Sequence, residues 1–116
     1  MRIDHLQLGC PPGGEEEARG FFGGLLGMAE LEKPAPLRAR GGCWFCSGEV
    51  ELHIGVEEEF RPQRKAHPAF AVADLEGVAA TLGQARCPVN WDTSLPDVRR
   101  FFTEDPFGNR IEFLAE

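Results

Sequence analysis

The sequence has 116 residues, the usual size of a single domain. Its formal net charge of −7 disfavours nucleic acids and anionic membranes as main partners, because affinity for phosphate-rich surfaces comes from basic patches. No apolar run reaches the roughly 18–20 residues needed to span a bilayer, and the first ten residues lack a signal-peptide pattern, so we expect a cytoplasmic protein.

The first half of the chain predicts a strand, a helix and a returning pair of strands. Three glutamates at positions 15–17 place negative charge in the first turn of the helix, which suits its dipole, and Gly27 is a natural stop. Pro34 and Pro36 mark a loop or a poor edge strand. The strands are predicted over residues 2–8, 41–46 and 49–56.

A polar loop over residues 57–65 separates this half from a second one with the same order of elements. Asp74 is a candidate N-cap for a helix that runs to about Leu82. The segment Asp105-Pro-Phe-Gly-Asn109 predicts a tight turn. The strands are predicted over residues 67–73, 88–91, 98–103 and 110–114. The repeated order of elements therefore predicts two similar modules.

The four cysteines are expected to be reduced packing residues. Cys43 and Cys46 have CxxC spacing, but they lie in an apolar strand, where residues three apart point to opposite faces. Cys10 and Cys87 are single, so the second cysteine pair of a zinc site is missing.

All three histidines and one glutamate lie in the outer strands of the two halves. His5 lies in the first strand of the first half, His67 begins the first strand of the second half, and His53 and Glu112 lie in the last strand of each half. Taken alone, each would be a hydrogen-bonded or half-exposed residue, but together they predict polar side chains directed into a shared cavity. Imidazole and carboxylate ligands suit a divalent zinc, nickel, iron or manganese ion. Glu51 and His53 share one strand face, so either is a candidate for the fourth ligand. The match of Val50-Glu-Leu52 to Ile111-Glu-Phe113 favours Glu51, with His53 as its rival.

Basic residues near these positions are candidates for substrate binding. Arg64 and Lys65 precede His67 and would hold an anionic group at the mouth of the cavity, unless they belong only to a solvated linker. Arg99 and Arg100 alternate along a strand, so only one of them can face inward, and we take Arg100 as the candidate.

Several segments together resemble the superfamily of glyoxalase I, bleomycin-resistance proteins and extradiol dioxygenases, also called vicinal oxygen chelate proteins. The most specific segment is Asp105-Pro-Phe-Gly-Asn-Arg-Ile-Glu112. Ile3-Asp-His-Leu6, the segment Phe21–Met28 and His67 before an apolar strand match in order. The resemblance covers nearly the whole chain.

This resemblance implies an α+β fold in which two βαβββ modules, about 1–60 and 66–116, form an open, cupped mixed sheet around a central cavity. The implied metal ligands are His5, the strand bearing Glu51 and His53, His67 and Glu112. It further implies a homodimer whose cavities use modules of both chains.

For function, the resemblance implies a metal-dependent lyase, isomerase or thiol transferase that binds two neighbouring oxygens of a small substrate, with Glu112 or Glu51 as general base. A metal-free protein that sequesters a drug is the first alternative, although such members lack the metal ligands. A dioxygenase is the second, and the absence of tyrosine disfavours it.

Overall fold

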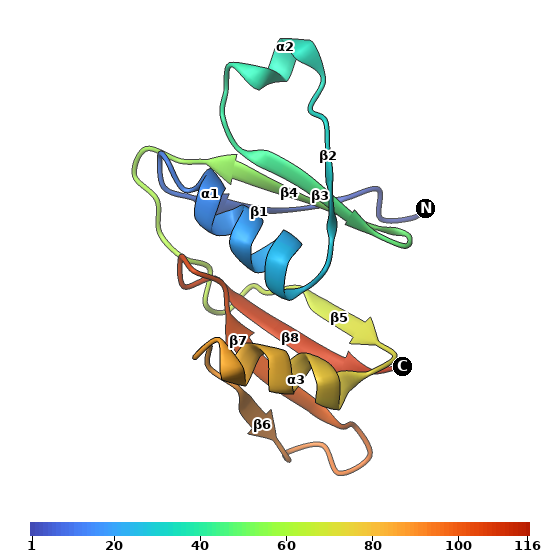
Figure 1. Ribbon diagram of the computed structural model, residues 1–116. Coiled ribbons are helices and arrows are strands. Elements are labelled where there is room, and N and C mark those ends of the chain that lie inside the picture. Colours follow the sequence, from blue (N-terminus) through green and yellow to red (C-terminus); the bar gives the residue numbers. More distant parts are fainter. The chain divides into compact units, whose positions relative to one another are not determined.

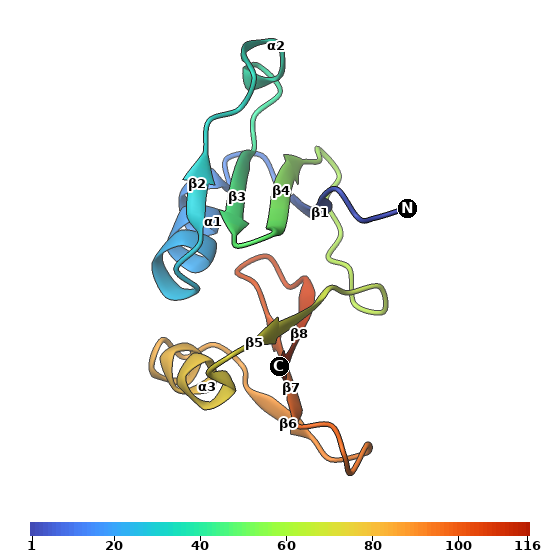
Figure 2. The same ribbon diagram turned by 90° about the vertical axis from the view of Figure 1, so that its right-hand side faces the viewer.

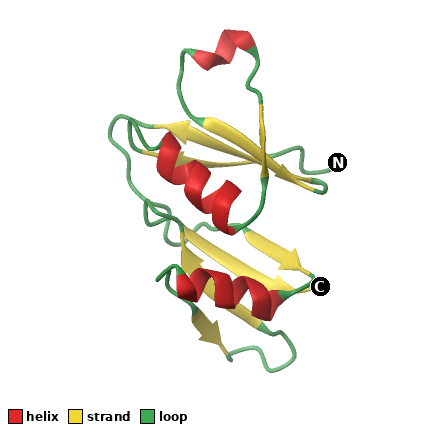
Figure 3. Ribbon diagram, in the orientation of Figure 1, coloured by secondary structure: helices red, strands yellow, loops and turns green.

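Two four-stranded mixed sheets, one in each half of the chain, form the framework of the protein (Figure 1). The computed structural model describes all of residues 1–116, which divide into two units, Met1–Pro62 and Gln63–Glu116. We call these units the first and second modules. Both contain a βαβββ arrangement, as Figure 3 shows, so the predicted α+β class and the repeated order of elements are confirmed.

The first module orders its strands β1-β4-β3-β2, with β1 parallel to β4 and the other pairs antiparallel. Between β1 and β2 a four-residue α-helix continues into a π-helical segment, in which Leu26 donates to the carbonyl of Phe21. The elements are β1 (Leu6–Cys10), α1 (Glu15–Ala18), η1 (Arg19–Leu25), β2 (Ala29–Leu31), α2 (Ala35–Arg38), β3 (Cys43–Ser47) and β4 (Val50–Val56).

The second module repeats this topology in the order β5-β8-β7-β6, with β5 parallel to β8. Asp74 caps the helix as predicted, because its carboxylate accepts a hydrogen bond from the backbone amide of Gly77 at 3.0 Å. The elements are β5 (Ala69–Val72), α3 (Leu75–Gln84), β6 (Asn90–Asp92), β7 (Arg100–Glu104) and β8 (Arg110–Ala115).

In each module the helix covers one face of the sheet (Figures 1 and 2). In the first module, Phe22 of η1 packs against Phe45 of β3 with ring centroids 5.7 Å apart. Leu52 and Ile54 of β4 are buried on this side. Strand alternation then places the intervening residues, His53 among them, on the opposite face, which we call the open face.

The predicted turn before the last strand is also present. The carboxylate of Asp105 accepts hydrogen bonds from the backbone amides of Phe107 and Asn109 and from the side chain of Asn109. Burial raises the pKa of Asp105, while these hydrogen bonds oppose the shift. The turn fixes the start of β8, which carries Glu112.

Three expectations differ from the structure. The first strand begins at Leu6, so His5 precedes it, and β5 begins at Ala69, two residues after His67. Pro34 and Pro36 lie at the start of the short helix α2, where proline costs no hydrogen bond, instead of in a loop or edge strand. The helix predicted from the apolar residues near Phe21 is mostly π-helical, in a segment rich in glycine.

The four cysteines are free, as expected. Burial raises the pKa of Cys43 to about 11, which keeps its thiol protonated at neutral pH. No helix of the structure has both the length and the apolar character required to cross a membrane.

Candidate functional site

A stack of three aromatic rings lies on the open face of the first module. The ring of Trp44 lies parallel to that of His53, with centroids 3.7 Å apart and planes 2° apart. His5 stacks on His53 at 4.1 Å and 15°. The imidazole of His53 is buried, whereas the side chain of His5 is 42% exposed, so His5 has the greater freedom to turn.

Both histidines of this module contact a carboxylate. Nδ1 of His5 lies 3.0 Å from Asp4, and Nε2 of His53 lies 2.9 Å from Glu51. A carboxylate accepts hydrogen bonds, so each of these ring nitrogens carries the proton that it donates. The hydrogen bond from His5 also holds the pKa of Asp4 below its usual range. The second nitrogen of each neutral ring keeps its lone pair, which is what a metal ligand requires.

The second module brings His67 and Glu112 together. Nδ1 of His67 lies 2.9 Å from the backbone carbonyl of Lys65, and its Nε2 lies 3.0 Å from Oε1 of Glu112. The carbonyl can only accept, so Nδ1 is the donor. In a neutral imidazole, Nε2 would then present its lone pair to a carboxylate oxygen. A proton or a metal ion between these two atoms removes that conflict.

Arg100 holds the other oxygen of Glu112. Its guanidinium donates to Oε2 of Glu112 at 3.2 Å and to Asp92 at 2.7 Å, and it lies 3.4 Å from the hydroxyl of Ser94. Both oxygens of Glu112 therefore have a partner. The carboxylates of Glu112 and Asp92 balance the charge of Arg100, so little of that charge is left to attract a substrate anion. The main effect of its contacts is to orient Glu112.

The strand registers identify which residue of the first module is equivalent to Glu112. In the second module, Glu112 pairs with Ala69, two residues after His67. In the first module, His53 pairs with Gln7, two residues after His5. The next ladder agrees, because Trp44 pairs with His53 as Phe102 pairs with Glu112. His53, and not Glu51, therefore occupies the position equivalent to Glu112.

Two of the four candidate ligands, His67 and Glu112, are already positioned to bind one divalent metal ion, whereas His5 and His53 are not. Nε2 of His67 and Oε1 of Glu112 are 3.0 Å apart, close to the roughly 3 Å between neighbouring ligands of an ion bound at about 2.0–2.2 Å. His5 and His53 differ, because an ion lies in the plane of each imidazole that binds it, and two nearly parallel stacked rings share no such point. No group of three or more histidine, cysteine or acidic side chains forms a metal site in the structure.

The other predicted substrate-binding residues lie apart from these pairs. Arg64 forms an exposed ion pair with Glu104 at 3.3 Å, and Lys65 is exposed. Arg100 lines a pocket of about 250 Å³ beside the loop between β6 and β7. Glu51, a predicted ligand and base, contacts His53 through one oxygen, and its side chain is 36% exposed.

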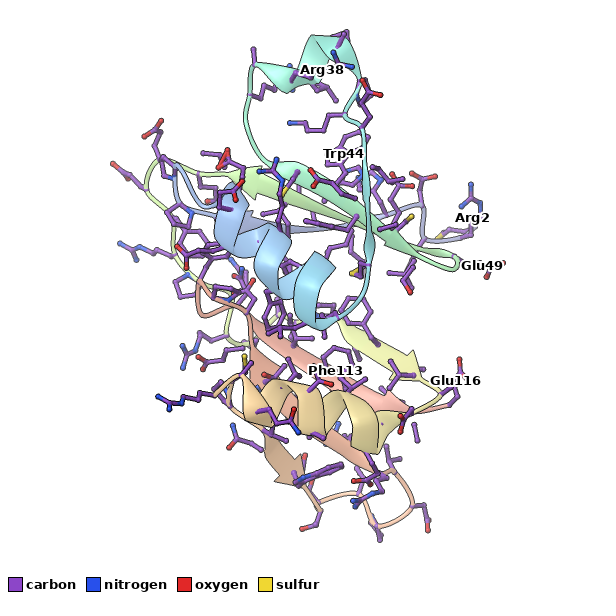
Figure 4. All side chains as sticks on the ribbon, in the orientation of Figure 1. Arg2, Arg38, Trp44, Glu49, Phe113 and Glu116 are labelled. Carbon is purple, nitrogen blue, oxygen red and sulfur yellow. The ribbon has the colours of Figure 1, made fainter.

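A second pocket, of about 400 Å³, lies on the open face of the first module. Its lining includes the stacked histidines His5 and His53 and also Trp44. Figure 4 labels Trp44. The sequence alone assigned no role to two other lining residues, Lys33 and Arg40. No motif marks those two cations, because only the fold of the β2–β3 connection brings them to β4.

Comparisons with known proteins agree with this architecture. No family model matches the sequence, and no curated protein matches it. A crystal structure of a protein from Bacillus anthracis, assigned to the glyoxalase family, is 49% identical over 100% of this chain and 95% of that chain, with a TM-score of 0.95.

Two more distant crystal structures share the fold. The fosfomycin resistance protein FosX from Listeria monocytogenes is 11% identical over 100% of this chain and 93% of that chain, with a TM-score of 0.80. Lactoylglutathione lyase from Agrobacterium tumefaciens is 15% identical over 95% of this chain and 91% of that chain, with a TM-score of 0.70.

Proposed function

The chain belongs to the glyoxalase, or vicinal oxygen chelate, superfamily, and we propose that it is a metal-dependent enzyme of this superfamily acting on a small, oxygen-rich, anionic molecule. The reaction would be that of a lyase, an isomerase or a thiol transferase. The observation that carries the proposal is the contact of 3.0 Å between Nε2 of His67 and Oε1 of Glu112, a spacing that suits two ligands of one divalent ion.

We propose His5, His53, His67 and Glu112 as the metal-binding residues. Glu51, the other candidate for the fourth position, has a different role in this proposal, because it accepts a hydrogen bond from His53 and so fixes which nitrogen of that ring has a lone pair. His5 would have to turn away from its stacked position, which its half-exposed side chain allows. The candidate ions are nickel, zinc, manganese and iron.

Bound at these residues, a divalent ion would supply Lewis acidity toward two adjacent substrate oxygens. The chain's own residues would orient the substrate and move a proton. Glu51 is the better of the two predicted bases, because its Oε2 makes no hydrogen bond, whereas both oxygens of Glu112 are engaged. Arg100 would keep Glu112 in place during the reaction.

A homodimer is also part of the proposal. Each four-stranded sheet ends in two edge strands, which are β1 and β2 in the first module and β5 and β6 in the second. Edge strands present unpaired backbone groups that proteins tend to cover. Light scattering at micromolar concentration should give twice the chain mass of 12.8 kDa, and a mass of 12.8 kDa alone would contradict this part.

The proposed activity is tested by metal analysis followed by a substrate panel. The purified protein should bind about one divalent ion per chain, and the loaded protein should turn over one of three substrate types. These are methylglyoxal with glutathione or bacillithiol, fosfomycin with either thiol, and catechol, each with nickel, zinc, manganese or iron. Binding of a drug such as bleomycin without metal and without turnover would support the sequestering alternative, and turnover of catechol with iron alone would support a dioxygenase.

A further inference from the structure

We propose that the pocket of about 400 Å³ on the open face of the first module binds the anionic group of the substrate, a carboxylate or a phosphate-type oxyanion, through Lys33 and Arg40. This inference rests on the proposed function for the identity of the ligand. It differs from the sequence-based expectation, which placed the anion on Arg64, Lys65 and Arg100.

The pocket has the size and lining of a small-molecule site. Its volume falls within the roughly 300–1,000 Å³ typical of ligand pockets, and its walls combine apolar and polar side chains. Trp44 and Leu37 supply apolar surface, while Gln7 and the two histidines supply hydrogen-bonding groups. A ligand held here would contact His5 and His53, which are both proposed metal ligands.

The charges of the lining have one sign. Lys33 and Arg40 are its two permanent cations, and it contains no carboxylate. Lys33 donates to the backbone carbonyl of Gly41, a neutral acceptor that leaves the charge of the ammonium group unbalanced. Arg40 forms no ion pair. In a chain of net charge −7, two unneutralised cations at one pocket create a local preference for an anion.

Two other arginines of this module are neutralised by ion pairs. Arg19 pairs with Glu16 and Glu30, and Arg38, only two residues before Arg40, pairs with Glu32. Arg40 differs from both, because no carboxylate lines its pocket.

The backbone holds the two cations at the pocket. Gly41 and Gly42 adopt positive φ angles of 74° and 83°, which let the chain turn sharply into β3. A Cβ atom on Gly42 would lie 2.2 Å from the carbonyl oxygen of Ile54, so the turn packs directly against β4. Gly55 has no side chain, and a Cβ there would lie 2.5 Å from the amide nitrogen of Gln7. The missing side chain leaves room for Gln7 within the pocket.

The test uses the full-length protein stripped of metal with a chelator. Inorganic phosphate and acetate serve as probes of the two oxyanion types, with acetamide as the neutral control, and affinity is measured by calorimetry and NMR titration. Phosphate or acetate should bind saturably while acetamide does not. The imidazole resonances of His5 and His53, which line the pocket, should shift.

Arg40→Gln should weaken anion binding by about tenfold, the usual effect of losing one charge-assisted hydrogen bond. Arg61→Gln is the matched control, because Arg61 is an exposed arginine of the same module that does not line the pocket, and the affinity of this variant should stay within about twofold of the wild type. Lys33→Gln should match Arg40→Gln. Since Lys33 also holds Gly41, the exposed Arg40 keeps the test valid if the Lys33 variant does not fold.

Glu112→Gln separates this inference from the proposed function. It should abolish metal retention and leave anion binding unchanged, because Glu112 does not line the pocket. If the wild-type protein binds the anion but does not bind an added divalent ion, the pocket is supported and the metal-dependent activity is contradicted. Absence of saturable binding, or equal affinity in the Arg40→Gln and Arg61→Gln variants, would overturn the inference.

Discussion

The open faces of the two modules share a topology but differ in chemistry. In the second module, Nε2 of His67 contacts one oxygen of Glu112, and Arg100 donates a hydrogen bond to the other oxygen. In the first module, the equivalent positions hold His5 and His53, whose rings stack beside a pocket with two free cations. One repeated fold thus carries a histidine–glutamate contact on one module and a pocket beside two stacked histidines on the other.

The largest expected effect comes from removing the carboxylate of the second module. Glu112→Gln should lower metal affinity by more than about 100-fold, the upper end of losses seen when only a neighbour of a ligand is changed. Calorimetry with zinc or nickel measures the loss. Glu104→Gln is the control, since Glu104 lies on the adjacent strand and pairs only with Arg64. Full metal occupancy in the Glu112 variant would remove Glu112 from the site.

Two variants of β4 test whether His53 or Glu51 is the metal ligand of the first module. His53→Gln should lower metal affinity by about 100-fold and Glu51→Gln by about tenfold, because His53 is the equivalent of Glu112 whereas Glu51 only orients His53. Both affinities are measured in the same titration. A larger loss for Glu51→Gln would mean that the carboxylate itself is the ligand.

The role of Arg100 separates orientation of Glu112 from substrate binding. Arg100→Gln should weaken metal binding by about tenfold without changing phosphate binding by the first module. Arg99→Gln is the matched control, because Arg99 pairs with Glu76 on the helix side of β7. Unchanged metal affinity together with a raised KM for substrate would instead support the expectation that Arg100 binds the substrate.

Mixing two variants shows whether one ion takes its ligands from one chain or from two. His5→Ala and His67→Ala should each fail to retain metal. After subunit exchange in a homodimer whose sites combine modules of both chains, roughly a quarter of the sites should regain all ligands. Metal analysis of the mixture measures this. Mass spectrometry verifies that the subunits have exchanged. If no metal binding is then recovered, each site lies within one chain.

The smallest expected effect concerns the cysteines of β3. With a pKa of about 11 and a buried side chain, Cys43 should resist iodoacetamide at pH 7.5, while the more exposed Cys46 reacts. Reactivity of Cys43 should appear only as the pH approaches its pKa. Mass spectrometry of the modified peptides reads out both residues, and rapid labelling of Cys43 at pH 7.5 would contradict its burial.

The sequence was sufficient to predict a helix start and a turn, because a single aspartate stabilises each of them. Asp74 caps its helix and Asp105 closes its turn, as their neighbours predict, because both carboxylates bind backbone amides close by in the chain. The helix α2 was missed because Pro34 and Pro36 argue against a strand and a helix interior, yet they are compatible with a first helical turn.

The choice between Glu51 and His53 required the structure. Both lie on the same face of β4, so strand alternation cannot separate them. Matching the flanking apolar residues favoured Glu51, whereas the pairing of Gln7 with His53 identifies His53 as the equivalent position. Lys33 and Arg40 were missed for a related reason, since no local pattern indicates that the β2–β3 connection returns to β4.

X-ray absorption spectroscopy of the zinc- or nickel-loaded protein tests the central claim most directly. The account predicts about one ion per chain, surrounded only by nitrogen and oxygen ligands at about 2.0–2.2 Å, with the multiple-scattering signal of imidazole. In the Glu112→Gln variant this ion should be lost. A sulfur ligand near 2.3 Å would place the ion on the cysteines. Either this sulfur signal or an unchanged spectrum in the Glu112→Gln variant would contradict the assignment of the four ligands His5, His53, His67 and Glu112.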